Sequence, residues 1–168
     1  MKFAIISDVH DNLANLEKAL NYINKNKIKT LICCGDLVLY DTFSFLIENF
    51  KGDLYYVFGN NEEWHEEDGK KIKNSENKTI QIFDKIGEFK IDKLKIAITH
   101  YPWIAKNLAK SEKFNLVFFG HSHKPTIETI NKTILLNPGT TGGVFFQPSF
   151  AIFDTNLKKP ELILLNEL

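Results

Sequence analysis

Side chains that can bind metal ions follow several apolar segments of this 168-residue chain. Two histidines, His121 and His123, flank one serine directly after the apolar run LVFF, and four of the five histidines lie at positions of this kind. The complete set is Asp8, His10, Asp36, Asn60, His100, His121 and His123. Imidazole nitrogens with carboxylate and amide oxygens, and without a thiolate, are ligands of borderline or hard divalent cations. The sequence therefore predicts a metal site assembled from five separate segments.

Each of these residues also has a purely structural interpretation. An aspartate after a strand commonly caps the next helix, and Gly-Asp or Gly-Asn pairs commonly form turns. The joint pattern favours the metal site, because glycine precedes Asp36, Asn60 and His121 and permits a sharp turn at each of these strand ends. The fifth histidine, His65, lies in a highly polar stretch and is interpreted as a solvated loop residue.

The first half of the chain alternates between segments typical of strands and of helices. Continuous apolar runs predict strands that are buried on both faces, and apolar residues at helical spacing predict the helices between them, the first with Asp11 or Asn12 as its N-cap. The predicted elements are strands at 2–7, 30–34 and 54–58 and helices at 13–23 and 42–50. This order indicates a parallel sheet, and the carboxyl ends of its strands form a ligand-binding crevice.

The second half is richer in strands. Helix 103–112 is predicted after a proline, the pair Asp92-Lys93 is predicted to form a hairpin turn, and 61–78 is predicted to be a surface loop with or without a short helix. The predicted strands, expected to be mostly antiparallel, lie at 78–83, 87–92, 94–99, 116–119, 126–130, 133–136, 150–153 and 161–165. The fold class predicted is α/β, as a four-layer αββα sandwich of two mixed β-sheets flanked by helices, with residues 1–168 forming a single domain.

Composition narrows the classes of partner. A net charge of zero argues against a strong nucleic-acid footprint, and no apolar run is long enough to span a membrane. The N-terminus is interpreted as a strand and not as a signal peptide. Cys33 and Cys34 are adjacent in an apolar run, which fits inert strand thiols and a cytoplasmic location. The chain has no arginine, so phosphate chemistry would depend on metals, lysine or backbone amides.

An ordered set of short motifs carries a family resemblance. The motifs DVH (8–10), GD (35–36), GNN (59–61), H (100), GHSH (120–123) and NPGT (137–140) occur in this order. Together they resemble the calcineurin-like metallophosphoesterases, and most closely their small single-domain phosphodiesterase branch. The resemblance spans most of the chain and implies a metal-dependent phosphodiesterase that hydrolyses phosphodiester bonds.

The resemblance also implies a centre of two divalent metal ions. Asp8, His10 and His123 would hold one ion, Asn60, His100 and His121 would hold the other, and Asp36 would bridge them. Mn²⁺ is the ion we expect, and Ni²⁺, Fe²⁺, Zn²⁺ and Mg²⁺ also suit these ligands. Two carboxylates facing two divalent ions leave a charge of about +2, or about +1 with a bridging hydroxide, so an anionic phosphate is attracted. The bridging hydroxide would attack the phosphorus.

One position departs from the family pattern. Many members have a histidine that protonates the leaving oxygen where this chain has Asn61. An amide can donate a hydrogen bond but cannot transfer a proton, so we expect activated esters to be cleaved much faster than alkyl esters. Asn61 is therefore assigned a catalytic and substrate-binding role. Asn12 and Lys124 are further candidates for substrate contacts, with an N-cap and a solvated lysine as their structural alternatives.

Other candidate features and functions stay open. Gly139 and Thr140 are expected to shape a turn beside the site, and Tyr101 and Trp103 to form a wall of it. The aromatic segment 142–150 is expected in the core or at a homodimer contact.

The expected substrate is a small phosphodiester or nucleotide-like molecule. The alternatives are a phosphomonoesterase and a catalytically weak protein-interaction scaffold, since the resemblance includes a retromer subunit with a degraded site. The complete ligand set favours the enzyme.

Overall fold

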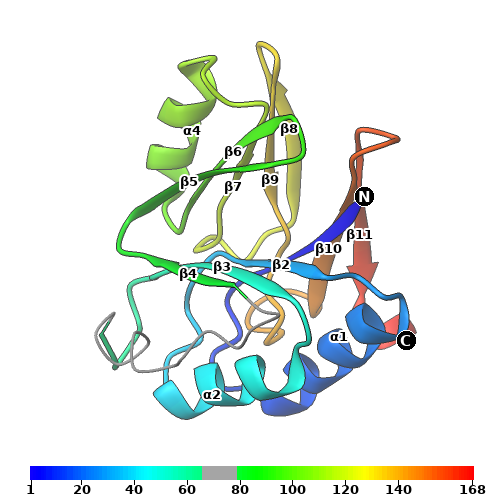
Figure 1. Cartoon of the computed structure of the whole chain (residues 1–168). Coiled ribbons are helices and arrows are strands. Elements are labelled where there is room, and N and C mark those ends of the chain that lie inside the picture. The colour runs from blue at the N-terminus through cyan, green and yellow to red at the C-terminus, as the bar shows by residue number, and fades with distance from the viewer. Residues whose placement is uncertain (66–78) are drawn as a thin grey trace.

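Two β-sheets pack face to face, and helices cover the outer face of each (Figure 1). This arrangement is a computed structural model of the chain that describes residues 1–65 and 79–168. The strand order is β11-β10-β1-β2-β3-β4 in the first sheet and β5-β6-β7-β9-β8 in the second. Both sheets contain parallel and antiparallel pairs. The predicted α/β class with two mixed sheets between helices is confirmed.

The first sheet has a parallel centre and an antiparallel side. Its strands are β1 (Lys2–Ile6), β2 (Thr30–Cys33), β3 (Asp53–Val57), β4 (Ile80–Phe83), β10 (Ser149–Asp154) and β11 (Lys159–Leu164). Strands β1 to β4 run parallel, whereas β10 pairs antiparallel with both β1 and β11. Helices cover one face of the sheet and the second sheet covers the other, which explains the continuous apolar runs of β1 and β2.

The second sheet is less antiparallel than the sequence suggested. Its strands are β5 (Ile86–Ile91), β6 (Leu94–Thr99), β7 (Leu116–Phe118), β8 (Thr126–Ile130) and β9 (Thr133–Asn137). The predicted hairpin turn at Asp92-Lys93 joins the antiparallel strands β5 and β6. Strand β7, however, pairs parallel with both β6 and β9. The expected antiparallel pairing was wrong for β7. A helix connects β6 to β7, and β8 connects β7 to β9. Each connection brings the chain back to the same end of the sheet, so the next strand runs in the same direction.

Three helices flank the sheets in the described part of the chain. They are α1 (Leu13–Lys25), α2 (Tyr40–Asn49) and α4 (Pro102–Lys110), and a 3₁₀ turn follows at Leu165–Glu167. Asn12 is the N-cap of α1, as one of the two predicted alternatives stated. Helix α2 begins two residues earlier than predicted. Its N-cap is Leu39, and Asp11 Oδ1 accepts the Leu39 N–H from a distant loop (3.1 Å).

Separate apolar layers fill the spaces between the elements. One lies between the first sheet and helices α1 and α2, one between the sheets, and one beneath α4. Cys33 belongs to the first layer and Cys34 to the second, so the adjacent cysteines face opposite ways as predicted. Burial raises the pKa of both thiols well above its usual value, which keeps them protonated and inert.

The polar loop predicted at 61–78 lies mostly outside the described residues, and no helix occurs at 61–65. Among the helices that the structure describes, none has the length and apolar character required to cross a bilayer.

Candidate metal centre

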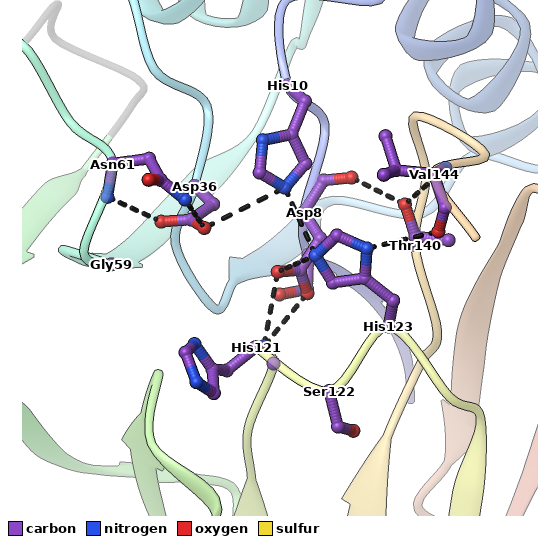
Figure 2. A network of polar contacts seen from close by, with 12 residues as sticks. Asp8, His10, Asp36, Gly59, Asn61, His121, Ser122, His123, Thr140 and Val144 are labelled. Carbon is purple, nitrogen blue, oxygen red and sulfur yellow. Dashed lines mark hydrogen bonds and ion pairs between the residues drawn. The ribbon is translucent and has the colours of Figure 1, made fainter. Parts of the chain in front are cut away.

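All seven predicted ligand residues lie together in space, beyond the carboxyl ends of their strands. Asp8 and His10 follow β1, Asp36 follows β2, Asn60 follows β3, His100 follows β6, and His121 and His123 follow β7. Figure 2 shows Asp8, Asp36 and three of the four histidines directed toward a common region. The first sheet therefore contributes four of these residues and the second sheet three.

One group of ligand atoms forms around His123. Its Nε2 atom lies 3.1 Å from His10 Nε2 and 3.2 Å from Asp8 Oδ1. The ligand atoms of Asp8, His10 and His123 all lie within 4.8 Å of one another. This is the set that the family resemblance implied for the first metal ion.

A second group forms around Asn60. Its Oδ1 atom lies 2.8 Å from His121 Nδ1 and 3.0 Å from His100 Nε2, and these two nitrogens are 3.3 Å apart. Asp36 lies between the groups, because its Oδ2 atom is 3.7 Å from His10 Nε2 and 3.5 Å from His100 Nε2. Ligand atoms of Asp8, Asp36 and His100 also lie within 4.8 Å of one another, so both carboxylates lie between the two groups.

Hydrogen bonds on the far side of the imidazoles show that the residues fit cations. His100 Nδ1 lies 2.7 Å from the Cys34 carbonyl oxygen, and His123 Nδ1 lies 3.0 Å from that of Val144. Each Nδ1 must carry a proton to donate to a carbonyl, so each neutral ring directs a bare Nε2 lone pair into the centre. There the lone pairs face carboxylate and amide oxygens, which are acceptors as well. A shared divalent cation satisfies such a set of acceptors, and the second partner of each histidine is typical of metal sites.

The backbone around the centre is strained. Five of the seven residues adopt the left-handed region, with φ between 47° and 67°: Asp8, His10, Asp36, His121 and His123. Non-glycine residues in this region are uncommon and concentrate at functional sites. The preceding glycines allow close approach, since a Cβ atom on Gly59 would lie 2.0 Å from Asp36 Oδ1 and one on Gly120 would lie 2.8 Å from Asp8 Oδ2.

Asn61 is directed into the centre, toward Asp36. Its Nδ2 donates to Asp36 Oδ2 (2.6 Å), while the backbone N–H groups of Asn60 and Asn61 donate to Oδ1 (2.9 and 3.0 Å). Burial opposes ionisation of Asp36, but His100 and these hydrogen bonds hold the pKa of its carboxyl group below its usual value. Asp36 is therefore held as a carboxylate beside both groups, and Asn61 fixes its orientation.

The other substrate-contact candidates lie differently. Asn12 is occupied as the N-cap of α1, since its Oδ1 accepts the Asn15 N–H and its Nδ2 donates to the Gly142 carbonyl. Lys124 is exposed. The structural alternative holds for Asn12, and a substrate contact by Asn12 or Lys124 stays a prediction. His65, interpreted as a loop residue, is exposed.

The turn expected at Gly139 and Thr140 and the aromatic residues expected beside the site are both present. The Thr140 hydroxyl donates to the Asp8 carbonyl (2.8 Å), and Gly139 adopts a φ of 86°. Tyr101 and Trp103 both contact the ring of His121, at centroid distances of 5.9 Å. They therefore border the centre on the side of the second sheet.

Two residues that hold the loops of the centre in place were not predicted from the sequence. Glu62 accepts hydrogen bonds from the Tyr56 hydroxyl and from the backbone N–H groups of Leu37 and Gly59, so it ties together the loops that carry Asp36 and Asn60. Its position directly after GNN was the available signal, but it lies in a polar stretch without periodicity. Asn137, the first residue of NPGT, donates to the Gly120 carbonyl and the Ser122 hydroxyl and braces the GHSH loop.

The fold and the centre together define a phosphoesterase with a metal-binding site. The family model for the calcineurin-like phosphoesterase superfamily domain matches residues 1–158, and the chain belongs to this superfamily. The phosphodiesterase MJ0936 of Methanocaldococcus jannaschii is 33% identical to the chain, over 98% of the chain and 99% of that relative.

Solved structures agree with this assignment. The structure of an archaeal phosphodiesterase superposes with a TM-score of 0.84 at 31% identity, covering 98% of this chain and 99% of that one. Vps29 from Entamoeba histolytica, in complex with Zn²⁺, gives a TM-score of 0.70 at 18% identity, covering 99% of this chain and 100% of that one. The latter similarity supports the fold alone.

Proposed function

We propose that the protein is a metal-dependent phosphodiesterase that hydrolyses small phosphodiesters at a centre of two divalent cations. The observation that carries the proposal is the pair of ligand groups that share Asp36. In this proposal Asp8, His10 and His123 would hold the first cation, Asn60, His100 and His121 would hold the second, and Asp36 would be shared between them. Superfamily membership and the 33% identical phosphodiesterase support the reaction class.

The ligand chemistry guides the choice of ion. Four imidazoles, two carboxylates and one amide suit Mn²⁺, and also Ni²⁺, Fe²⁺, Zn²⁺ and Mg²⁺, so supply in the cell decides among them. A centre with two divalent cations and two carboxylates carries a charge of about +2, which attracts a phosphate although the protein as a whole is neutral.

We propose the cytoplasm as the location, since both cysteines are buried free thiols.

The chain's own residues orient the reaction. When bound, two such cations neutralise charge on the phosphate and lower the pKa of a water molecule so that it becomes the nucleophile. Asp36 stays ionised because of its hydrogen bonds to residues 60 and 61, and His100 and His123 are fixed by the carbonyl groups behind them. Asn61 can donate a hydrogen bond to the substrate but cannot protonate the leaving oxygen. The reaction therefore depends on leaving groups that depart as anions.

Hydrolysis by metal-depleted protein tests the proposal. Bis(4-nitrophenyl) phosphate and 4-nitrophenyl phosphate are supplied in parallel, with each candidate ion restored in turn. We expect the diester to be cleaved faster than the monoester and no cleavage without added metal. Faster cleavage of the monoester would indicate a phosphomonoesterase. Inactivity with every ion would indicate an interaction scaffold.

A further inference from the structure

Two exposed aromatic side chains border opposite ends of the ligand cluster. The ring of Trp103, 57% exposed, lies 5.9 Å from that of His121 and perpendicular to it. The ring of Phe145, 89% exposed, lies 5.5 Å from that of His123 at an angle of 38°. His121 belongs to the ligand group around Asn60, whereas His123 belongs to the group with Asp8. Each aromatic residue therefore adjoins a different ligand group.

The structure holds both rings in place although they gain little from burial. Trp103 lies in the first turn of α4 and packs on Tyr101, with ring centroids 4.9 Å apart. Phe145 follows Val144, whose N–H is accepted by the Thr140 hydroxyl and whose carbonyl accepts the His123 Nδ1–H. These bonds anchor the segment that carries Phe145 to the loop that carries His123.

The conformation of Phe145 indicates a use for its exposed ring. Its φ of 66° lies in the left-handed region, which a bulky side chain rarely adopts. Such strain persists where the surrounding structure imposes it, and it concentrates at ligand-binding positions. A mostly exposed phenylalanine adds little to the stability of the core. Beside a cationic centre, a flat apolar ring is suited to contact the non-phosphate part of an anionic substrate.

We infer that the substrate is a small phosphodiester that carries a nucleobase, which stacks on Phe145 or Trp103 while the phosphate lies at the ligand cluster. The inference rests on the proposed function and specifies its substrate class. A diester has a substituent on each side of the phosphorus, and the two aromatic residues provide one flat surface for each. Stacking tolerates different bases, and the chain has no arginine for bidentate recognition. The zero net charge favours a mononucleotide or dinucleotide ester over a long polymer.

Two substrates with the same leaving group test the inference by kinetics. Thymidine 5′-(4-nitrophenyl) phosphate and methyl 4-nitrophenyl phosphate each react with water to release nitrophenol and leave a monoester. We expect kcat/KM for the thymidine ester to be about 5- to 10-fold higher, the low end of the range for base–aromatic stacking. A ratio close to one would overturn the inference.

Matched variants assign the effect to the two rings. Phe145→Leu and Trp103→Leu each keep an apolar side chain but remove the flat surface. The variant that lacks the ring stacked on the base should reduce the ratio of the two kcat/KM values to about one, mainly through KM. The variant that lacks the ring beside the leaving group should slow both substrates. Leu157→Ala, at a position 74% exposed in the β10–β11 turn, is the control and should leave the ratio unchanged. A ratio that survives in both aromatic variants would contradict the assignment.

Calorimetry separates this inference from the proposed function. Thymidine 5′-monophosphate should bind the metal-loaded protein about 5- to 10-fold more tightly than ribose 5-phosphate, and the Phe145→Leu/Trp103→Leu double variant should lose the difference. Failure to hydrolyse either nitrophenyl ester counts against the proposed function, whereas equal binding of the two phosphates, or no binding of either, overturns the inference. A dimer in sedimentation that Phe145→Leu abolishes, with no change in the binding ratio, would assign the ring to a second copy of the chain instead.

Discussion

The Nε2 atoms of His10 and His123 lie 3.1 Å apart, although the two residues are separated by 113 positions in the chain. The His123 Nδ1 donates to the Val144 carbonyl, so its Nε2 presents a lone pair to His10 and to Asp8. Neighbouring lone pairs repel one another unless a proton or a metal ion lies between them. This contact is therefore a sensitive position at which to test metal binding.

Removing either of these imidazoles should remove one cation. For His123→Ala and His10→Ala we expect the number of bound divalent ions to fall from two to one, because the site around Asp36, Asn60 and His100 keeps its ligands. Metal analysis after dialysis, and calorimetric titration, measure this number. His65→Ala, at an exposed loop position, is the control and should keep both ions. Two ions retained in either ligand variant would contradict the proposed ligand set.

Restoring a proton donor at position 61 should broaden the range of leaving groups. The Asn61 side chain faces Asp36 Oδ2 at 2.6 Å, so an imidazole introduced there starts beside the centre. We expect Asn61→His to accelerate cleavage of alkyl esters by about 10²- to 10⁴-fold and to change nitrophenyl esters little. A plot of log kcat against the pKa of the leaving group should be steep in the wild type and flatter in the variant. Equal slopes in the two proteins would rule out a missing general acid.

Asn61→Ala is the matched control for this substitution, since it removes the hydrogen bond to Asp36 without supplying an acid. His65→Ala should leave the slope of the wild type unchanged. A flatter wild-type slope that depends on His65 would instead identify this histidine as the acid.

Glu62 should stabilise the fold and the centre together. In Glu62→Ala the Tyr56 hydroxyl and two backbone N–H groups, of Leu37 and Gly59, lose their acceptor. Each unsatisfied buried donor costs about 1–3 kcal/mol, and we expect a loss of about 2–4 kcal/mol in the free energy of unfolding after partial relaxation. Urea titration of the metal-free protein measures this loss. Glu62→Gln keeps an acceptor oxygen and should lose clearly less, so equal losses would disprove the hydrogen-bond explanation.

The stability of the metal-free protein should fall in acid partly through Asp36. Burial raises the pKa of this carboxyl group, but His100 and the hydrogen bonds from Asn61 outweigh it and leave the pKa below its usual value. A lowered pKa in the folded state means that the contribution is complete above about pH 4 and disappears as the pH falls through the folded-state pKa. Urea midpoints between about pH 6 and pH 3 should therefore decrease less in Asp36→Asn than in the wild type. Asp92→Asn, in an exposed turn, should behave like the wild type.

The clustering of the candidate ligand residues could be predicted because strand ends are visible in the sequence. Asp8, Asp36 and His121 each follow a continuous apolar run, and parallel strands bring their carboxyl ends to one edge of a sheet. The same logic placed the two cysteines on opposite faces of β2 and its continuation. Hydrophobic patterns that repeat every two residues in strands, or nearly every four in helices, predict which face a side chain lies on without knowledge of the partner strands.

Contacts between distant loops could not be predicted in this way. The role of Asp11 depends on the N–H of Leu39, 28 residues further along the chain, and that of Glu62 depends on the N–H of Leu37, 25 residues before it. The direction of β7 was missed because a short apolar run fits parallel and antiparallel pairing equally well. The exposed ring of Phe145 was expected in the core or at a dimer contact, since composition does not reveal on which side of a loop a side chain emerges.

Strand β1 pairs with β2 on one side and with β10, residues Ser149–Asp154, on the other. Phe3 pairs with Phe153, so this side of the sheet closes only when residues 150 positions apart in the sequence meet. A contact of such long range carries a large loop-closure entropy and slows folding. A circular permutant in which β10 and β11 precede β1 should therefore refold faster than the wild type in stopped-flow experiments.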